Sequence, residues 1–125
     1  MSYLLDSHAL LWWLEDSPRI GATLRRTIAD PQTRVLISAA WVWEIGIKQA
    51  LGKLRAPESI ADLLQDEGFE ELTITVRHAA AAACLPALHR DPFDRMLVAQ
   101  ARLDRLTLVT HDEAIQAYDV DVMTV

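Results

Sequence analysis

Short apolar runs that alternate with segments of helical periodicity constrain the fold of this chain most strongly. The runs that predict strands are residues 3–5, 35–37, 72–76, 106–109 and 120–123, the last of them as an edge strand. Alternation of strands and helices favours parallel strands joined by right-handed crossovers. The sequence therefore predicts an α/β fold in which helices cover a mainly parallel sheet.

The segments between these runs carry helical periodicity and helix-capping residues. The expected helices are residues 8–14 capped by Ser7, a segment opened by Ser17 and Pro18, residues 39–51, 57–65 and 77–85, one that starts at Pro92 with Asp91 as its N-cap, and a short one within 113–118. Pro92 suits the first helical position because the backbone N–H that it lacks would have no partner there.

Length, charge and cysteine content narrow the class of protein. The 125 residues suit one domain that spans residues 1–125. The net charge of −6 argues against a protein that coats nucleic acid. The single cysteine, Cys84, excludes an internal disulfide and a cysteine-based zinc site, and it suits a reducing cytoplasm. No signal peptide and no membrane-spanning run is expected.

Four acidic residues fall where parallel strands end or where the adjoining helices begin. Asp6 ends the first strand, and Asp112 follows the strand at 106–109. Glu44 lies in the early turns of the helix after the second strand, and Asp94 lies at the start of the helix from Pro92. Ligands bind beyond the carboxyl ends of such strands, so three or all four carboxylates are expected at one edge.

Structural explanations of these acids remain open at this stage. Asp91 and Asp94 occupy the N-cap and N3 positions, where helices favour acceptors and acids. Glu44 stands four residues before Lys48, an arrangement typical of a surface ion pair.

Clustered carboxylates repel one another unless they share a proton or bind a hard cation. Mg²⁺ or Mn²⁺ suits oxygen ligands, and such an ion can activate water for phosphodiester hydrolysis. The sequence contains neither a Walker A loop nor a G-x-G-x-x-G motif. A zinc site through His8 or His111 is disfavoured because no helical histidine pair is present.

Four segments in order resemble the motifs of PIN-domain ribonucleases, in particular the VapC-type toxins of type II toxin–antitoxin systems. They are LLDSHALLW at residues 4–12, WEIGIK at 43–48 followed by GKL at 52–54, HRDPFDR at 89–95, and THD at 110–112. The resemblance extends over essentially the whole chain. It implies a three-layer α/β/α fold and RNA cleavage that depends on Mg²⁺ or Mn²⁺.

The resemblance also implies a site and partners. Its catalytic and metal-binding acids fall on Asp6, Glu44, Asp94 and Asp112. Ser7 and Thr110 match the hydroxyl residues that support them, and Thr110 could orient Asp112 or a water. The implied partners are an RNA substrate, a cognate antitoxin and a second copy in a homodimer.

Further residues are candidates for contacts with these partners. Lys48 and Arg95 lie close in sequence to the acids and could contact a substrate phosphate. Four tryptophans could line a groove for an antitoxin segment, although core packing is the default for tryptophan: Trp12, Trp13, Trp41 and Trp43. A PIN nuclease in RNA processing and a non-catalytic PIN-like module that binds a partner are the alternative functions.

Overall fold

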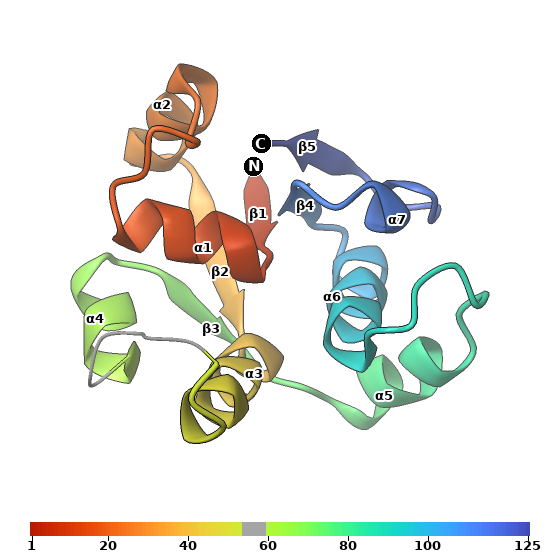
Figure 1. Cartoon of the computed structure of the whole chain (residues 1–125). Coiled ribbons are helices and arrows are strands. Elements are labelled where there is room, and N and C mark those ends of the chain that lie inside the picture. Colours follow the sequence, from red (N-terminus) through yellow and green to blue (C-terminus); the bar gives the residue numbers. More distant parts are fainter. Residues whose placement is uncertain (54–59) are drawn as a thin grey trace.

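The computed structural model describes residues 1–53 and 60–125 and shows a parallel sheet between two layers of helices (Figure 1). The strands are β1 (Ser2–Leu5), β2 (Arg34–Ser38), β3 (Glu70–Leu72), β4 (Thr107–Thr110) and β5 (Val122–Thr124). Within the described residues their order is β3-β2-β1-β4-β5, and every neighbouring pair is parallel. The predicted parallel sheet is confirmed, and β5 lies at an edge as predicted.

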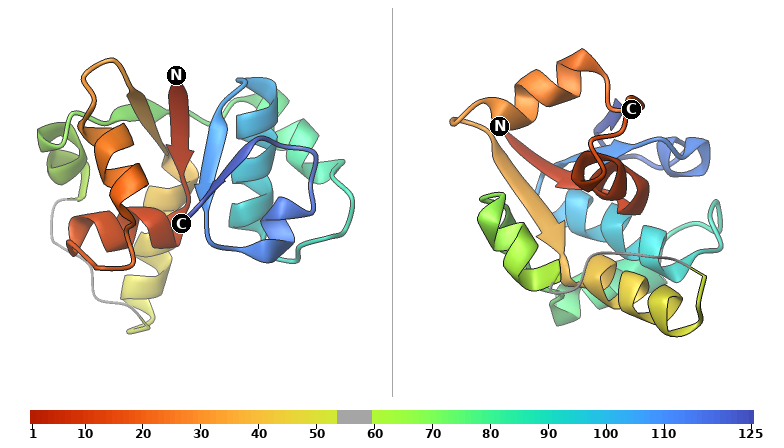
Figure 2. Two further views of the ribbon diagram at one scale, coloured as in Figure 1. Left: turned by 90° about the horizontal axis from the view of Figure 1, so that it is seen from above. Right: turned by 60° about the vertical axis from the view of Figure 1, so that its left-hand side comes forward.

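Helices cover both faces of the sheet. They are α1 (Ser7–Leu14), α2 (Ala22–Ala29), α3 (Ala39–Ala50), α4 (Ile60–Asp66), α5 (Val76–Ala83), α6 (Pro92–Leu103) and α7 (Glu113–Gln116). Seen from above, α1 and α2 lie on one side of β1 and β4, and α5 and α6 lie on the other (Figure 2). The three-layer α/β/α arrangement implied by the resemblance is present.

The alternation of side chains along the central strands divides the core into two parts. Leu4 of β1 belongs to the cluster that packs beneath α5, α6 and α7. Its neighbours Tyr3 and Leu5 belong to the cluster beneath α1, α2 and α4. Both faces of β1 are therefore buried, which explains why this strand reads as an unbroken apolar run.

Two helix starts differ from the sequence predictions. Asp6, not Ser7, caps α1, because its carboxylate accepts a hydrogen bond from the Ala9 N–H at 2.9 Å. The second helix begins at Ala22 rather than directly after Ser17 and Pro18. The Ser17 hydroxyl accepts from the Arg19 N–H and stabilises a local turn there instead.

The strand predicted at residues 72–76 is wrong in position, since β3 ends at Leu72. Thr75 caps α5 in a reciprocal arrangement with His78, whose ring accepts the Thr75 N–H. This capping box outweighs the alternating pattern and makes Val76, which is 87% exposed, the first helical residue. Of the helix predicted at 57–65, residues 57–59 lie outside the described residues, and α4 accounts for the remainder.

None of the helices in the two described ranges combines the length and the apolar character that a membrane span requires.

Gln100 provides a buried polar link between α6 and the ends of β2 and β3. Its side-chain carbonyl accepts from the Ser38 hydroxyl at 2.6 Å, and its amide donates to the Thr73 carbonyl at 3.3 Å. The side chain is fully buried, so water cannot replace these bonds.

Replacing Gln100 by leucine should lower the free energy of unfolding by about 1–3 kcal/mol, because the buried partners lose their hydrogen bonds. Urea denaturation measures this loss. Gln116→Leu, at an exposed position on α7, is the matched control and should stay within about 0.5 kcal/mol of the wild type. Equal effects of the two substitutions would show that the buried link contributes nothing.

Candidate functional site

The four acids singled out in the sequence gather at the carboxyl edge of the sheet. Asp6 follows β1 directly, and Asp112 lies two residues after β4. Glu44 lies in α3, which follows β2, and Asp94 lies in the first turn of α6. Asp6 and Glu44 are 3% and 2% exposed, and the other two are partly buried. The negative charges of Asp6 and Glu44 both act on Asp94, and one oxygen of Asp112 lies within 4.8 Å of one oxygen of Asp94.

Asp6 and Asp112 are linked through the buried hydroxyl of Thr110. The Thr110 side chain hydrogen-bonds the Asp6 carboxylate, and its oxygen accepts from the Asp112 N–H at 3.0 Å. Burial raises the pKa of Asp6 despite this bond and the one from Ala9. Thr110 therefore fixes the first and last acids relative to each other.

Glu44 has two partners of its own. The Ser7 hydroxyl donates to one carboxylate oxygen, and the Lys48 ammonium lies 2.8 Å from the other. The hydrogen bond with Glu44 raises the pKa of Lys48. The Glu44–Lys48 pair anticipated from the sequence is therefore formed, but its carboxylate is buried rather than on the surface.

His89 lies between Asp94 and Asp112. Its Nε2 is 2.7 Å from Asp112 Oδ2 and 3.2 Å from Asp94 Oδ2. Burial would raise the pKa of Asp112, but the hydrogen bond with His89 and that from the Ala114 N–H hold it below its usual value. Burial opposes protonation of His89, whereas Asp112 and Asp94 outweigh it and raise the pKa of the imidazole. The Asp91 N–H points at Nδ1 and disfavours a proton there.

Of the four acids, Asp94 is the one whose pKa the negative charges gathered at the site affect most strongly. Burial, together with the charge of Asp91, raises its pKa from 3.8 to about 7; His89 lowers it, and Glu44 and Asp6 raise it further. One oxygen each of Asp94 and Asp112 and one nitrogen of His89 lie within 4.8 Å of one another. Converging carboxylate oxygens with surplus negative charge suit a hard divalent cation, so the oxygens of Asp94 and Asp112 could hold a metal ion.

Two of the remaining candidates take part in the fold around the site. Asp91 caps α6, as predicted, through a 2.8 Å bond from the Phe93 N–H. The guanidinium of Arg95 donates to the carbonyls of Ala82 and Leu85 at 2.9 and 3.0 Å. Arg95 therefore faces the loop that precedes α6 and not the acids.

The four tryptophans differ in burial. Trp41 is fully buried, and its indole N–H donates to the Ser7 carbonyl at 3.3 Å. Trp12 and Trp13 are half-buried on α1, whereas Trp43 is 65% exposed. Core packing thus accounts for Trp41, and Trp43 is the tryptophan that presents most surface to a partner.

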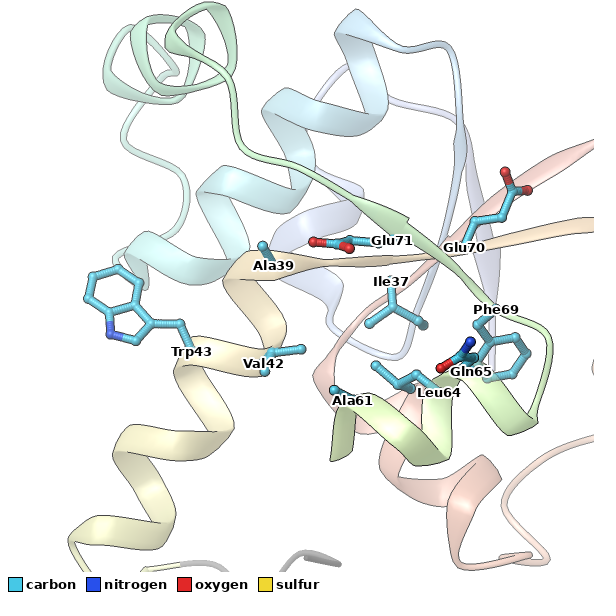
Figure 3. A pocket seen from close by; sticks show the side chains of 10 residues that line it. All are labelled: Ile37, Ala39, Val42, Trp43, Ala61, Leu64, Gln65, Phe69, Glu70 and Glu71. Atoms are coloured by element: carbon cyan, nitrogen blue, oxygen red, sulfur yellow. The ribbon is translucent and has the colours of Figure 1, made fainter. Parts of the chain in front are cut away.

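Trp43 lines a mainly apolar cavity of about 670 Å³ between α3, α4 and β3 (Figure 3). The lining residues are Ile37, Ala39, Val42, Trp43, Ala61, Leu64, Gln65, Phe69, Glu70 and Glu71. None of the four clustered acids is among them, so this groove is separate from the carboxylate site.

His89 is the site residue that sequence reasoning missed, because its place at the start of the HRDPFDR segment does not show which side chain it contacts. A polar side chain two residues before the N-cap of α6 was the available signal. What the signal could not show is that the preceding loop carries the ring to Asp112.

The protein is a three-layer α/β/α protein whose parallel sheet has acidic residues at its carboxyl edge. Comparison with known proteins identifies its family. The PIN domain model matches residues 3–121, and the chain therefore belongs to the PIN domain family. Ribonuclease VapC22 of Mycobacterium tuberculosis (strain ATCC 25618 / H37Rv) is 26% identical over 118 residues, which cover 92% of this chain and 90% of that protein.

Solved structures agree with this fold. VapBC2 from Rickettsia felis, bound to a DNA fragment from its promoter, superimposes with a TM-score of 0.69 at 14% identity and covers 99% of this chain and 98% of that one. A toxin–antitoxin complex from Klebsiella pneumoniae gives 0.67 at 22% identity, with 98% and 96% coverage. The resemblance to VapC-type PIN domains is confirmed.

The raised pKa of Asp94 predicts how stability depends on pH without metal. The pKa of Asp94 is about 7 in the folded chain, compared with 3.8 for an ordinary aspartate such as that of the unfolded chain. The protonated carboxyl therefore stabilises the fold fully below about pH 4, and this contribution is lost as the pH rises to about 7. In EDTA, Asp94→Asn should therefore gain stability over the wild type across that window, on the order of 3 kcal/mol in all. Urea denaturation at several pH values measures the difference.

Asp119→Asn, which removes one negative charge at an exposed position outside the site, is the matched control for the change of charge. A difference between Asp94→Asn and wild type that stays constant from pH 4 to 8 would mean that Asp94 is ionised throughout.

Proposed function

We propose that this chain is a metal-dependent ribonuclease that hydrolyses RNA phosphodiester bonds and acts as the toxin of a type II toxin–antitoxin pair. The observation that carries the proposal is the convergence of Asp6, Glu44 and Asp112 on Asp94, whose pKa is raised to about 7. Membership of the PIN domain family and the similarity to a relative named ribonuclease support the same function.

In this proposal Asp6, Glu44, Asp94 and Asp112 hold Mg²⁺ or Mn²⁺. A bound divalent ion would lower the pKa of a coordinated water and offset the charge of the scissile phosphate. Thr110 orients Asp6 and Asp112, and Ser7 orients Glu44, through the bonds described above. These supports fix the carboxylates before substrate arrives, which is the arrangement that electrostatic catalysis requires.

Lys48 is the better of the two cations proposed for the phosphate. Its side chain is 42% exposed and lies next to Glu44, where it also experiences the charges of Asp91 and Asp94. An ammonium at this position can meet a phosphate oxygen without leaving the site. Arg95 is occupied by backbone carbonyls and has no part in this proposal.

Purified protein, free of antitoxin, should cleave RNA with Mg²⁺ or Mn²⁺ and lose this activity in EDTA. Asp6→Asn and Asp94→Asn should each lower the rate on the order of 100-fold or more, because each removes a charged metal ligand. Asp119→Asn is the control and should leave the rate unchanged. Gel electrophoresis of labelled RNA measures cleavage.

Activity that persists in both site variants would come from another nuclease and would contradict the proposal. Folded wild-type protein that is inactive with either metal on several RNAs would favour the alternative of a partner-binding module. The four clustered carboxylates repel one another, and a module that only binds a partner does not need such an arrangement. This weighs against the alternative.

We propose that a cognate antitoxin binds the groove between α3, α4 and β3. Several structural neighbours are VapBC toxin–antitoxin complexes. The groove is mainly apolar, and the exposed Glu71 is among its lining residues, whereas Glu70 is paired with Arg34 at 2.8 Å. It therefore suits an amphipathic helix with basic residues along one border. The similarity to VapC-type PIN domains is also the basis for our proposal that the chain forms a homodimer in the cytoplasm. Analytical ultracentrifugation tests the oligomeric state.

Trp43→Ala should weaken binding of the antitoxin about 10-fold, because an exposed aromatic side chain at the end of an apolar groove is a typical binding hot spot. Calorimetry with the purified antitoxin measures the affinity. Val76→Ala removes an apolar side chain that is even more exposed, at 87% against 65% for Trp43, and lies outside the groove, so it should have no effect. If both variants bind like the wild type, the antitoxin occupies another surface.

A further inference from the structure

His89 connects two acids that come from different elements of the fold. It lies in the loop before α6, and its Nε2 reaches Asp94 in α6 and Asp112 at the start of α7. Its side chain is 15% exposed, so water screens these contacts poorly. Among the described residues, no other side chain forms a hydrogen bond or ion pair with both carboxylates.

The backbone determines which ring nitrogen carries the proton. The Asp91 N–H donates to Nδ1 at 3.0 Å, so Nδ1 is an acceptor. The neutral ring therefore carries its proton on Nε2, the nitrogen that faces Asp112 and Asp94. A cation at Nε2 would need the proton on Nδ1, where it would meet the Asp91 N–H. His89 is thus a donor to the carboxylates and not a metal ligand.

A separate network holds the loop that carries His89. The His89 N–H donates to the Tyr118 hydroxyl at 2.9 Å, and that hydroxyl donates to the Pro86 carbonyl at 2.8 Å. The Arg95 guanidinium donates to the same Pro86 carbonyl at 3.0 Å. The ring is therefore fixed before any ligand arrives, because both its backbone and its Nδ1 are bonded.

We propose that His89 is a positioning residue whose Nε2–H holds Asp94 and Asp112 at the separation that a divalent cation needs. The inference rests on the proposed function of the site. Without the bridging proton, the two carboxylates repel and separate, and metal binding must first bring them together again. Groups that orient metal ligands in this way typically change metal affinity about 10- to 100-fold.

Two substitutions separate the roles of the ring nitrogens. His89→Gln places an amide donor near the position of Nε2, whereas His89→Asn replaces only the Nδ1 acceptor. In the absence of RNA, Mn²⁺ binding measured by electron paramagnetic resonance and Mg²⁺ binding measured by calorimetry should fall about 10-fold or more in His89→Asn and within about 3-fold in His89→Gln. Both metals should lose affinity by the same factor, since His89 contacts neither.

Three results would overturn the inference. The first is that His89→Asn binds both metals as tightly as the wild type does. The second is that both variants lose metal affinity equally and that Mn²⁺ binding falls more than Mg²⁺ binding, as expected if His89 were a nitrogen ligand of the metal. The third is a wild-type chain that binds neither metal, which would overturn the proposed metal site as well. Urea denaturation in EDTA shows whether the variants fold. Tyr118→Phe removes the hydroxyl that holds the loop but leaves the His89 ring unchanged, so it should lower metal affinity less than His89→Asn does.

Discussion

Repulsion among carboxylates at one edge of the sheet is the interaction on which the rest of the site depends. Most of these acids have partners that reduce the repulsion. Asp6 has Thr110, Glu44 has Ser7 and Lys48, and Asp112 has His89. Asp94 shares His89 and has the charges of its neighbours around it, so the surplus negative charge is concentrated there.

Helix starts are the second means of stabilising these charges. Asp6 caps α1 and Asp112 caps α7, each through a backbone N–H, and Asp94 lies in the first turn of α6. The N-terminal end of a helix favours negative charge and supplies free N–H donors. Capping and metal binding are therefore compatible roles for the same carboxylates, because a cap uses one oxygen, and the other, which in Asp112 accepts from His89, keeps a lone pair for a cation.

The central strands could be predicted from the sequence because they are buried on both faces and so appear as continuous apolar runs. The bounds of the edge strand β3 could not, since residues 72–76 alternate like a strand while Thr75 and His78 form a helix cap. The acids were predictable from their places beside strand ends. His89 was not, because its role depends on Tyr118, 29 residues later, which holds the loop against the site.

The groove and the carboxylate site are separate, but both include residues from one turn of α3. Trp43 lines the groove, and Glu44, the next residue, points into the acidic cluster. The Trp43 ring also packs edge-on against Phe93, at 5.3 Å between centroids, and Phe93 directly precedes Asp94. An occupant that moves Trp43 would thus press on the helix turns that carry two of the four acids. The groove and the acids are therefore adjacent through this aromatic contact and through one turn of α3.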